Sequence, residues 1–342
     1  MAITAGDAGL TCGILPAGAR NAITDVPGVL VGHCTLSEGE VNTGVTAILP
    51  HGGDLFRRKV MAAAEIINGF GKTVGLVQVQ ELGTIETPIL LTNTLSVGTC
   101  ATALIREAIR RNPDIGRRTG TVNPVVGECN DGPLNDIQAL AVTEDHALAA
   151  LADAGDGAVA QGSVGAGTGM TCFGFKGGIG SASRRLSLGG ADHHLGALVL
   201  ANFGRAGDLV LPDGRRPDPR REAEAESGSV IIVLATDVPL EHRQLARVAR
   251  RAGAGIARLG AFWGHGSGDI TIAFDTANAV DHEEKAAFTT LRVLNETHID
   301  LLFRAAAEAT QEAVLNAMLA APPFTGRAGQ HRPSLADWLK SG

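Results

Sequence analysis

Tyrosine is absent from the 342 residues, and tryptophan occurs only twice. Basic residues are also scarce: 29 lysines and arginines stand against 36 aspartates and glutamates, which gives a net charge of −7. A nucleic-acid surface needs a basic face, so nucleic acid is not an expected partner. No apolar run reaches the roughly 18 residues of a membrane span. The first residues lack the basic region and apolar core of a secretory signal, so we expect a cytoplasmic protein that does not bind a membrane.

Cysteine and histidine give no sign of a metal centre. The cysteines are odd in number, far apart and without a CxxC pair; they are Cys12, Cys34, Cys100, Cys129 and Cys172. Free thiols in a reducing compartment explain them better than disulfides or zinc ligands do. Two histidines form a tandem pair, His193-His194, but no HExxH or HxH motif occurs. We expect neither a metal nor an organic cofactor.

Hydrophobic patterning predicts a layered α/β protein. Buried strands are predicted at 194–204 and 228–240, and amphipathic helices at 241–260 and 298–321. The stretch 60–72 is predicted to be a helix, 73–82 a strand, and 86–111 a strand or loop that leads into a helix. That helix is expected to turn one face inward, formed by Leu104, Ile105, Ala108 and Ile109. Long helices before and after groups of strands favour β sheets covered by helices, in one domain that spans 1–342.

Two segments are expected to lie outside this core. The charged, proline-rich stretch 212–227 is predicted to be an exposed loop or hairpin tip. The sequence PPF at 322–324 ends the last helix, and we expect a mobile tail after it.

The stretch WGHGSGDITIAF, residues 263–274, places Ser267 between two glycines at the start of an alternating strand. It does not match the GxSxG of α/β hydrolases, because the last glycine is missing and a strand follows instead of a helix. The glycines of QGSVGAGTGM at 161–170 are not followed by a helix either, so they do not match a dinucleotide fingerprint.

A third possibility is that the chain is cut just before this serine. Cutting between Gly266 and Ser267 would give the serine an α-amino group, whose pKa near 8 suits it to take the hydroxyl proton. From these residues alone, a plain Gly-Ser-Gly turn explains the pattern more simply.

Several segments together resemble a known family. In order along the chain, from about residue 8 to about residue 322, they are GARNAITDVPGVLVGH, ELGTIETPILLTNTLSVG, PVVGECNDGPLNDI, GSVGAGTGMTCFGFKGGIGSASR, ATDVPL, GSGDITIAFDTAN and EATQEAVLNA. They are similar to the self-cleaving aminopeptidases, the family of L-aminopeptidase/D-Ala-esterase/amidase and the β-peptidyl aminopeptidases. The resemblance implies a four-layer α/β/β/α sandwich that resembles the N-terminal-nucleophile hydrolases but has a different strand connectivity. It also implies self-cleavage into 1–266 and 267–342, and homo-oligomers, commonly tetramers of such processed pairs.

The resemblance assigns roles to single residues. Ser267 is the nucleophile, and its freed amine is the base. Asn202 corresponds to the asparagine that donates to the oxyanion. Glu128 corresponds to an acid near the substrate's free amino group. Thr310 and Glu312 are the best match to a hydroxyl residue and a glutamate that hold the nucleophile and its amine.

One family feature is missing, because some members use a tyrosine near the oxyanion and this chain has none. Asn130, or a backbone amide such as that of Gly268, is the expected substitute. The predicted function is removal of small N-terminal residues from peptides, amides or esters, through an acyl-enzyme and a glycine-lined gate at 161–180. An amidase for a pantetheine-like or oligoamide substrate, and a non-catalytic protein that keeps the fold, stay open as alternatives.

Overall fold

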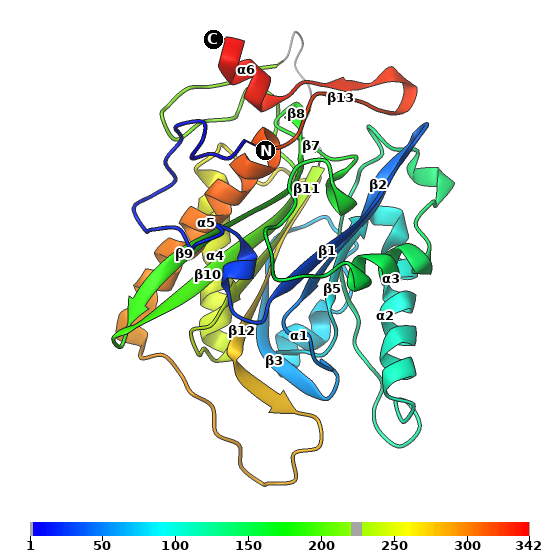
Figure 1. Cartoon of the computed structure of the whole chain (residues 1–342), viewed down its shortest axis with the longest axis vertical. Coiled ribbons are helices and arrows are strands. Elements are labelled where there is room, and N and C mark those ends of the chain that lie inside the picture. Colours follow the sequence, from blue (N-terminus) through cyan, green and yellow to red (C-terminus); the bar gives the residue numbers. More distant parts are fainter. Residues whose placement is uncertain (1–2, 220–227, 342) are drawn as a thin grey trace.

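Two β sheets lie face to face between two layers of helices (Figure 1). The computed structural model describes residues 3–219 and 228–341. The first sheet has the order β1-β2-β5-β6, formed by β1 (Leu30–Glu38), β2 (Val41–Leu49), β5 (Ile89–Asn93) and β6 (Val125–Cys129). The second has the order β4-β3-β12-β11-β10-β9, formed by β4 (Thr84–Ile85), β3 (Arg58–Gly69), β12 (Ser267–Asp281), β11 (Gly228–Thr236), β10 (Ala191–Asn202) and β9 (Gly178–Leu188).

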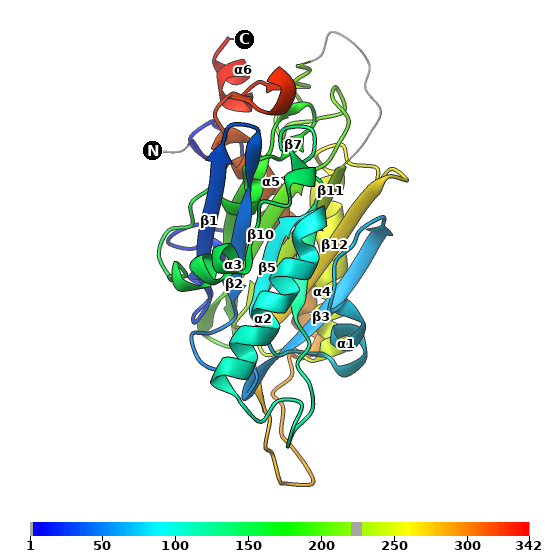
Figure 2. The same ribbon diagram turned by 90° about the vertical axis from the view of Figure 1, so that its right-hand side faces the viewer.

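Helices close the outer face of each sheet (Figure 2). The first sheet is covered by α2 (Val97–Arg111) and α3 (Glu144–Ala152), and the second by α4 (His242–Ala257) and α5 (Ile299–Leu319). The remaining elements are short and include α1 (Leu76–Leu82), η4 (Gly165–Gly167), β7 (Thr171–Cys172), β8 (Phe175–Lys176), β13 (Phe324–Thr325), β14 (His331–Arg332) and α6 (Leu335–Ser341). The expected four-layer α/β/β/α sandwich is therefore confirmed.

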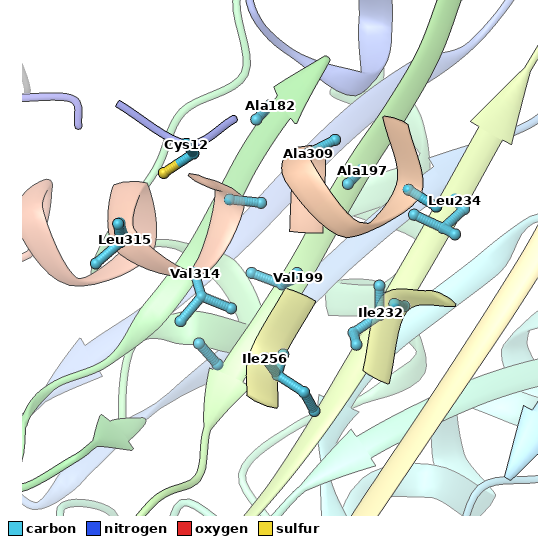
Figure 3. Close-up of a cluster of buried hydrophobic side chains, with 14 of the residues drawn as sticks. Cys12, Ala182, Ala197, Val199, Ile232, Leu234, Ile256, Ala309, Val314 and Leu315 are labelled. Atoms are coloured by element: carbon cyan, nitrogen blue, oxygen red, sulfur yellow. The ribbon is translucent and has the colours of Figure 1, made fainter. Parts of the chain in front are cut away.

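Each boundary between layers has its own apolar core. Side chains of α2 and α3 pack on the first sheet, and a second cluster fills the space between the sheets. The third cluster joins α4 and α5 to the second sheet, where Val314 and Ile256 face Val199 and Ile232 (Figure 3). Strands of the second sheet are buried on both faces, so alternate residues enter different cores.

The buried strands and the long helices after residue 194 were predicted correctly. For two neighbouring elements the prediction was the wrong way round, with a helix expected at 60–72 and a strand at 73–82. The stretch 60–72 is the strand β3, not a helix, because pairing with β4 and β12 outweighs the helix preference of its alanines. The stretch 73–82 contains the helix α1, not a strand. There Leu76 and Val79, three residues apart, are buried, while Val77 is 85% exposed.

Two further expectations need correction, and one is tested only in part. The chain after the last helix is ordered, since β13, β14 and α6 follow and Leu335 is fully buried. Helix α2 turns Leu104 inward as expected, but Ile109 is 40% exposed and Val97, Cys100 and Ala103 complete the buried face. Of the predicted loop 212–227, residues 220–227 lie outside the described residues. None of the helices in 3–219 and 228–341 has the length and apolarity of a membrane span.

Candidate active site

Ser267 is the first residue of β12, a central strand of the second sheet. It is only 1% exposed, although Phe262 and Trp263 just before it are 56% and 39% exposed. The backbone N–H of Ser267 donates to the carbonyl of Gly264 at 2.9 Å, which closes a tight turn. The predicted scissile bond, between Gly266 and Ser267, therefore lies inside an exposed turn that ends at a buried serine.

Asn68 of β3 holds this turn from the neighbouring strand. Its side-chain amide donates to the carbonyl of Gly264 at 2.9 Å and also to the carbonyl of Ser267. The N–H of Phe70 donates to the same Ser267 carbonyl at 3.3 Å. Both ends of the turn are thus fixed to β3.

The hydroxyl of Ser267 donates to Oδ1 of Asp269 at 2.7 Å. Residues two apart in a strand share one face, so this contact follows from the extended backbone. Ala273, on the same face, packs in the cluster beneath α4 and α5, whereas Ile270 and Ile272 enter the core between the sheets. Strand alternation therefore places the Ser267 side chain on the face covered by the helices.

Gly268 lies on the other face, towards the space between the sheets. Its N–H donates to the hydroxyl of Ser229 on β11 at 3.1 Å. A Cβ on Gly268 would lie 2.8 Å from the carbonyl oxygen of Phe70, so only glycine fits there without displacement. Around Gly266, by contrast, no atom lies within 4 Å of such a Cβ.

Asn202 is the last residue of β10, and its side chain is fixed by two backbone groups. Its Oδ1 accepts from the N–H of Thr171 at 2.9 Å, and its Nδ2 donates to the carbonyl of Asn130 at 3.0 Å. Asn130 itself is exposed, and its side-chain oxygen accepts from the N–H of Gly132 at 2.9 Å. The amide donor of Asn202 points across the gap between the sheets, from the end of β10 to the end of β6.

Glu128 is buried at the end of β6, with an exposed fraction of 2%. Its carboxylate accepts from the N–H of Lys72 at 2.7 Å and from the hydroxyl of Thr94. A Cβ built on Gly71 would lie 3.6 Å from Glu128 Oε1 and 3.9 Å from the Cα of Gly268. The carboxylate is therefore close to the start of β12, on the face where Gly268 lies.

Thr310 and Glu312 lie on α5, in the layer that covers the Ser267 face. Thr310 is fully buried against Gly255 of α4, and its hydroxyl has no hydrogen-bond partner among the described residues. Glu312 turns to the opposite side of the helix, as a separation of two residues dictates. There its carboxylate accepts from Asn21 at 2.5 Å and pairs with Arg184 at 2.7 Å. Within the described part of the chain, no hydrogen bond joins either residue to Ser267.

A buried lysine holds the glycine-rich segment beside Asn202. The ammonium of Lys176 donates to the carbonyls of Gly167, Met170 and Gly177 at 3.0, 3.0 and 2.9 Å. Burial lowers the pKa of Lys176 to about 7, and burial raises the pKa of Asp131 nearby to about 6. These contacts fix the loop whose Thr171 N–H orients the Asn202 side chain. In 3–219 and 228–341, no group of three His, Cys, Asp or Glu side chains could hold a metal ion.

Three residues of this region were missed in the sequence. Asp269 could have been found, because alternation in GSGDITIAF places it on the same face as Ser267. Ser229 carries no comparable signal. Asn68 could not be found, since its segment was predicted to be a helix.

The four α/β/β/α layers thus hold a buried serine, Ser267, at the start of a central strand of the second sheet. A model of Peptidase family S58 matches residues 21–332, and the chain belongs to that family. It is a hydrolase of the serine aminopeptidase class.

Relatives agree with this assignment along nearly the whole chain. The β-peptidyl aminopeptidase BapA of Sphingosinicella microcystinivorans is 40% identical over 336 residues, which cover 90% of this chain and 84% of that protein. The crystal structure of the PH0078 protein from Pyrococcus horikoshii OT3 has 45% identity and a TM-score of 0.92, covering 99% of this chain and 98% of that one. L-aminopeptidase D-Ala-esterase/amidase from Ochrobactrum anthropi, described as a variant of the Ntn hydrolase fold, has 38% identity and a TM-score of 0.90, with 98% and 96% covered.

Proposed function

We propose that the chain cuts itself between Gly266 and Ser267 and then acts as an N-terminal-serine aminopeptidase. The observation that carries the proposal is the position of Ser267, buried at the start of β12 directly after an exposed turn. Cutting would release residues 262–266 from that position and give the serine a free amine. The site would then open without any movement of the sheet.

After cutting, the α-amine of Ser267 takes the hydroxyl proton, and the hydroxyl attacks the acyl carbon of the substrate. Before cutting, Ser267 and Asn202 point to opposite faces of the second sheet. Release from the turn frees the Ser267 side chain to turn towards the gap between the sheets. There Asn202 Nδ2 stabilises the oxyanion, as an amide donor does in other acyl transfers. The N–H of Gly268 or the side chain of Asn130 is the second donor, in place of a tyrosine.

Glu128 binds the free amino group of the substrate. Its buried carboxylate lies near the start of β12 and would pair with an ammonium once Lys72 or Thr94 gives way. The hydroxyl of Thr310 holds the nucleophile and its amine, whereas Glu312, the expected second member of this pair, is bound by Arg184 and Asn21 on the opposite side of α5. Of these two, Thr310 is the better placed, because its buried hydroxyl has no partner in the described residues and lies on the Ser267 side of the sheet.

The substrates are peptides, amides or esters with small N-terminal residues, including β-amino acids. The glycine-rich segment 161–180 lies beside Asn202, since the N–H of Thr171 donates to Asn202 Oδ1 at 2.9 Å, and we expect it to form the gate that favours short side chains. The names of the relatives, β-peptidyl aminopeptidase and L-aminopeptidase D-Ala-esterase/amidase, support this substrate class.

Trapping of the acyl-enzyme tests the mechanism. Purified protein is mixed with an excess of alanine or β-alanine p-nitroanilide and quenched in acid within its first turnovers, and the fragments are weighed. The proposal expects fragment 267–342 to gain the mass of the acyl group. An acyl group on the other fragment, or turnover by a Ser267→Ala variant, would contradict it.

A second experiment tests Glu128. The Glu128→Gln variant is compared with wild type on a free-amine substrate and on its N-acetylated form. We expect the variant to lose at least about tenfold in kcat/KM on the free amine only, because an amide cannot replace a charged partner for ammonium. Equal losses on both substrates would show that Glu128 supports the fold instead.

Assembly and compartment complete the proposal. We expect processed pairs to associate, as tetramers of heterodimers, which light scattering during size-exclusion chromatography would show. The five unpaired cysteines support a reducing compartment such as the cytoplasm.

A further inference from the structure

Self-cleavage needs a base that the uncut chain cannot obtain from Ser267 itself. Before the cut, the nitrogen of Ser267 belongs to a peptide bond, and its N–H donates to the carbonyl of Gly264. An amide nitrogen has no basic lone pair, so it cannot take the proton of the hydroxyl. The amine that serves the mature enzyme appears only after the first proton transfer has taken place.

The uncut structure places a carboxylate at the position that such a base must occupy. Ser267 Oγ donates to Asp269 Oδ1 at 2.7 Å, and both residues are 1% exposed. A general base has to lie within hydrogen-bond distance of the proton that it takes. Because the contact joins alternate residues of one strand, it exists in the chain before any cut or substrate.

We propose that Asp269 is the general base of self-cleavage between Gly266 and Ser267, an inference that rests on the proposed function. Asp269 Oδ1 takes the hydroxyl proton as Ser267 Oγ forms a bond to the carbonyl carbon of Gly266. The C=O electron pair moves to oxygen, which gives a five-membered tetrahedral intermediate. When this collapses, the C–N bond breaks and Asp269 returns the proton to the leaving nitrogen.

The products of this step are an ester between Gly266 and Ser267 Oγ and a free Ser267 amine. One water molecule then hydrolyses the ester, which leaves a carboxyl group on Gly266 and restores the Ser267 hydroxyl. Asp269 ends in its starting state, so the net reaction is hydrolysis of one peptide bond.

Asn68 prepares the same bond for attack. Its amide fixes the carbonyls of Gly264 and Ser267, which enclose the scissile bond, to β3. The turn is therefore held while the hydroxyl and its acceptor are already in contact, and such orientation is a large part of the advantage of an intramolecular reaction.

The test follows the cutting of full-length chains from the moment of synthesis. Wild type, Asp269→Asn and Asp269→Glu are made by cell-free translation, and fragment 267–342 is measured against time by mass spectrometry. Ser267→Ala provides the uncut reference. Thr271→Val is the matched control, because Thr271 is buried on the same strand face and its hydroxyl has no partner among the described residues. Circular dichroism establishes which chains are folded.

The two substitutions at Asp269 distinguish a general base from a residue that only fills space. Asparagine keeps the shape of aspartate and loses the basic oxygen, whereas glutamate keeps the carboxylate and adds a methylene. We expect Asp269→Asn to cut at least about 100-fold more slowly than wild type, as removal of a general base does. Asp269→Glu should cut faster than Asp269→Asn, and Thr271→Val should cut within about threefold of wild type.

Several other results would contradict the role of Asp269 as the general base. The inference is overturned if Asp269→Asn cuts itself at a rate within about tenfold of wild type. It is also overturned if Asp269→Asn cuts itself faster than Asp269→Glu. If Asp269→Glu does not fold, Ser267→Cys is added to Asp269→Asn, and the more acidic thiol should restore cutting at least tenfold. Failure of that rescue, or failure of Asp269→Asn to fold, assigns Asp269 a structural role and also overturns the inference. A wild type that stays uncut would instead refute the proposed function.

Discussion

Gly266 and Gly268 flank the same serine, yet the structure predicts opposite results when each is replaced by alanine. A Cβ on Gly268 would lie 2.8 Å from the carbonyl oxygen of Phe70 and 3.1 Å from the Cα of Gly71. Both are backbone atoms, and Phe70 cannot retreat easily because its N–H donates to the carbonyl of Ser267 at 3.3 Å. A Cβ on Gly266 would meet no atom within 4 Å, and its backbone is not in the left-handed region.

Overpacking of this kind costs about 1–3 kcal/mol, whereas a surface change without new contacts stays within about 0.5 kcal/mol. With an unfolding entropy of about 2.1 cal/mol/K per residue, 1 kcal/mol corresponds to roughly 1.4 °C in melting temperature for a chain of 342 residues. Gly268→Ala should therefore melt roughly 1–4 °C lower, and Gly266→Ala within about 1 °C of its parent. Both are made in the Ser267→Ala background, so that every chain is uncut, and melting is followed by circular dichroism. Equal losses, or a larger loss for Gly266→Ala, would refute the packing described around Ser267.

Three further predictions concern other positions. Burial lowers the pKa of His33 to about 4, so between about pH 6.5 and pH 4 the unfolded chain binds more protons and stability is lost as the pH falls. Across this window, the free energy of unfolding measured by urea titration should fall by up to about 3 kcal/mol more for wild type than for His33→Asn. The same pH dependence of that free energy in both proteins would contradict this prediction. Glu312→Gln should lower the unfolding free energy by about 1–3 kcal/mol, since Arg184 keeps its second partner, Glu308, at 3.3 Å; an unchanged urea midpoint would contradict the pairing. Asn68→Ala should slow self-cleavage at least about tenfold while the chain stays folded, and cutting at the wild-type rate would show that the turn needs no support from β3.

The sequence predicted best those elements that have one clear period or are buried throughout. The strands β10 and β11 and the helices α4 and α5 lie where they were expected. The exchange of β3 and α1 has a physical cause, because a strand buried on both faces has no alternation and alanine favours helices when considered locally. Pairing with β4 and β12 decides the conformation of β3, and such long-range contacts cannot be seen in a window of ten residues.

The site shows the same limit. Ser267, Asn202 and Glu128 were found by resemblance, and in the structure Ser267 begins β12, Asn202 ends β10 and Glu128 is next to last in β6. The resemblance could not show that Ser267 and Asn202 lie on opposite faces of the sheet before cutting, because this depends on strand alternation in three dimensions. Nor did it show that Glu312 turns towards Arg184, although a spacing of two on a helix already separates it from Thr310.

The most direct test of self-cleavage is the intact mass, under denaturing conditions, of freshly purified wild type beside Ser267→Ala. The account predicts two masses for wild type, those of 1–266 and 267–342, and a single mass of the whole chain for the variant. A single, lasting full-length mass in both proteins would contradict it, and the stretch WGHGSGDITIAF would then be a plain turn that leads into a strand.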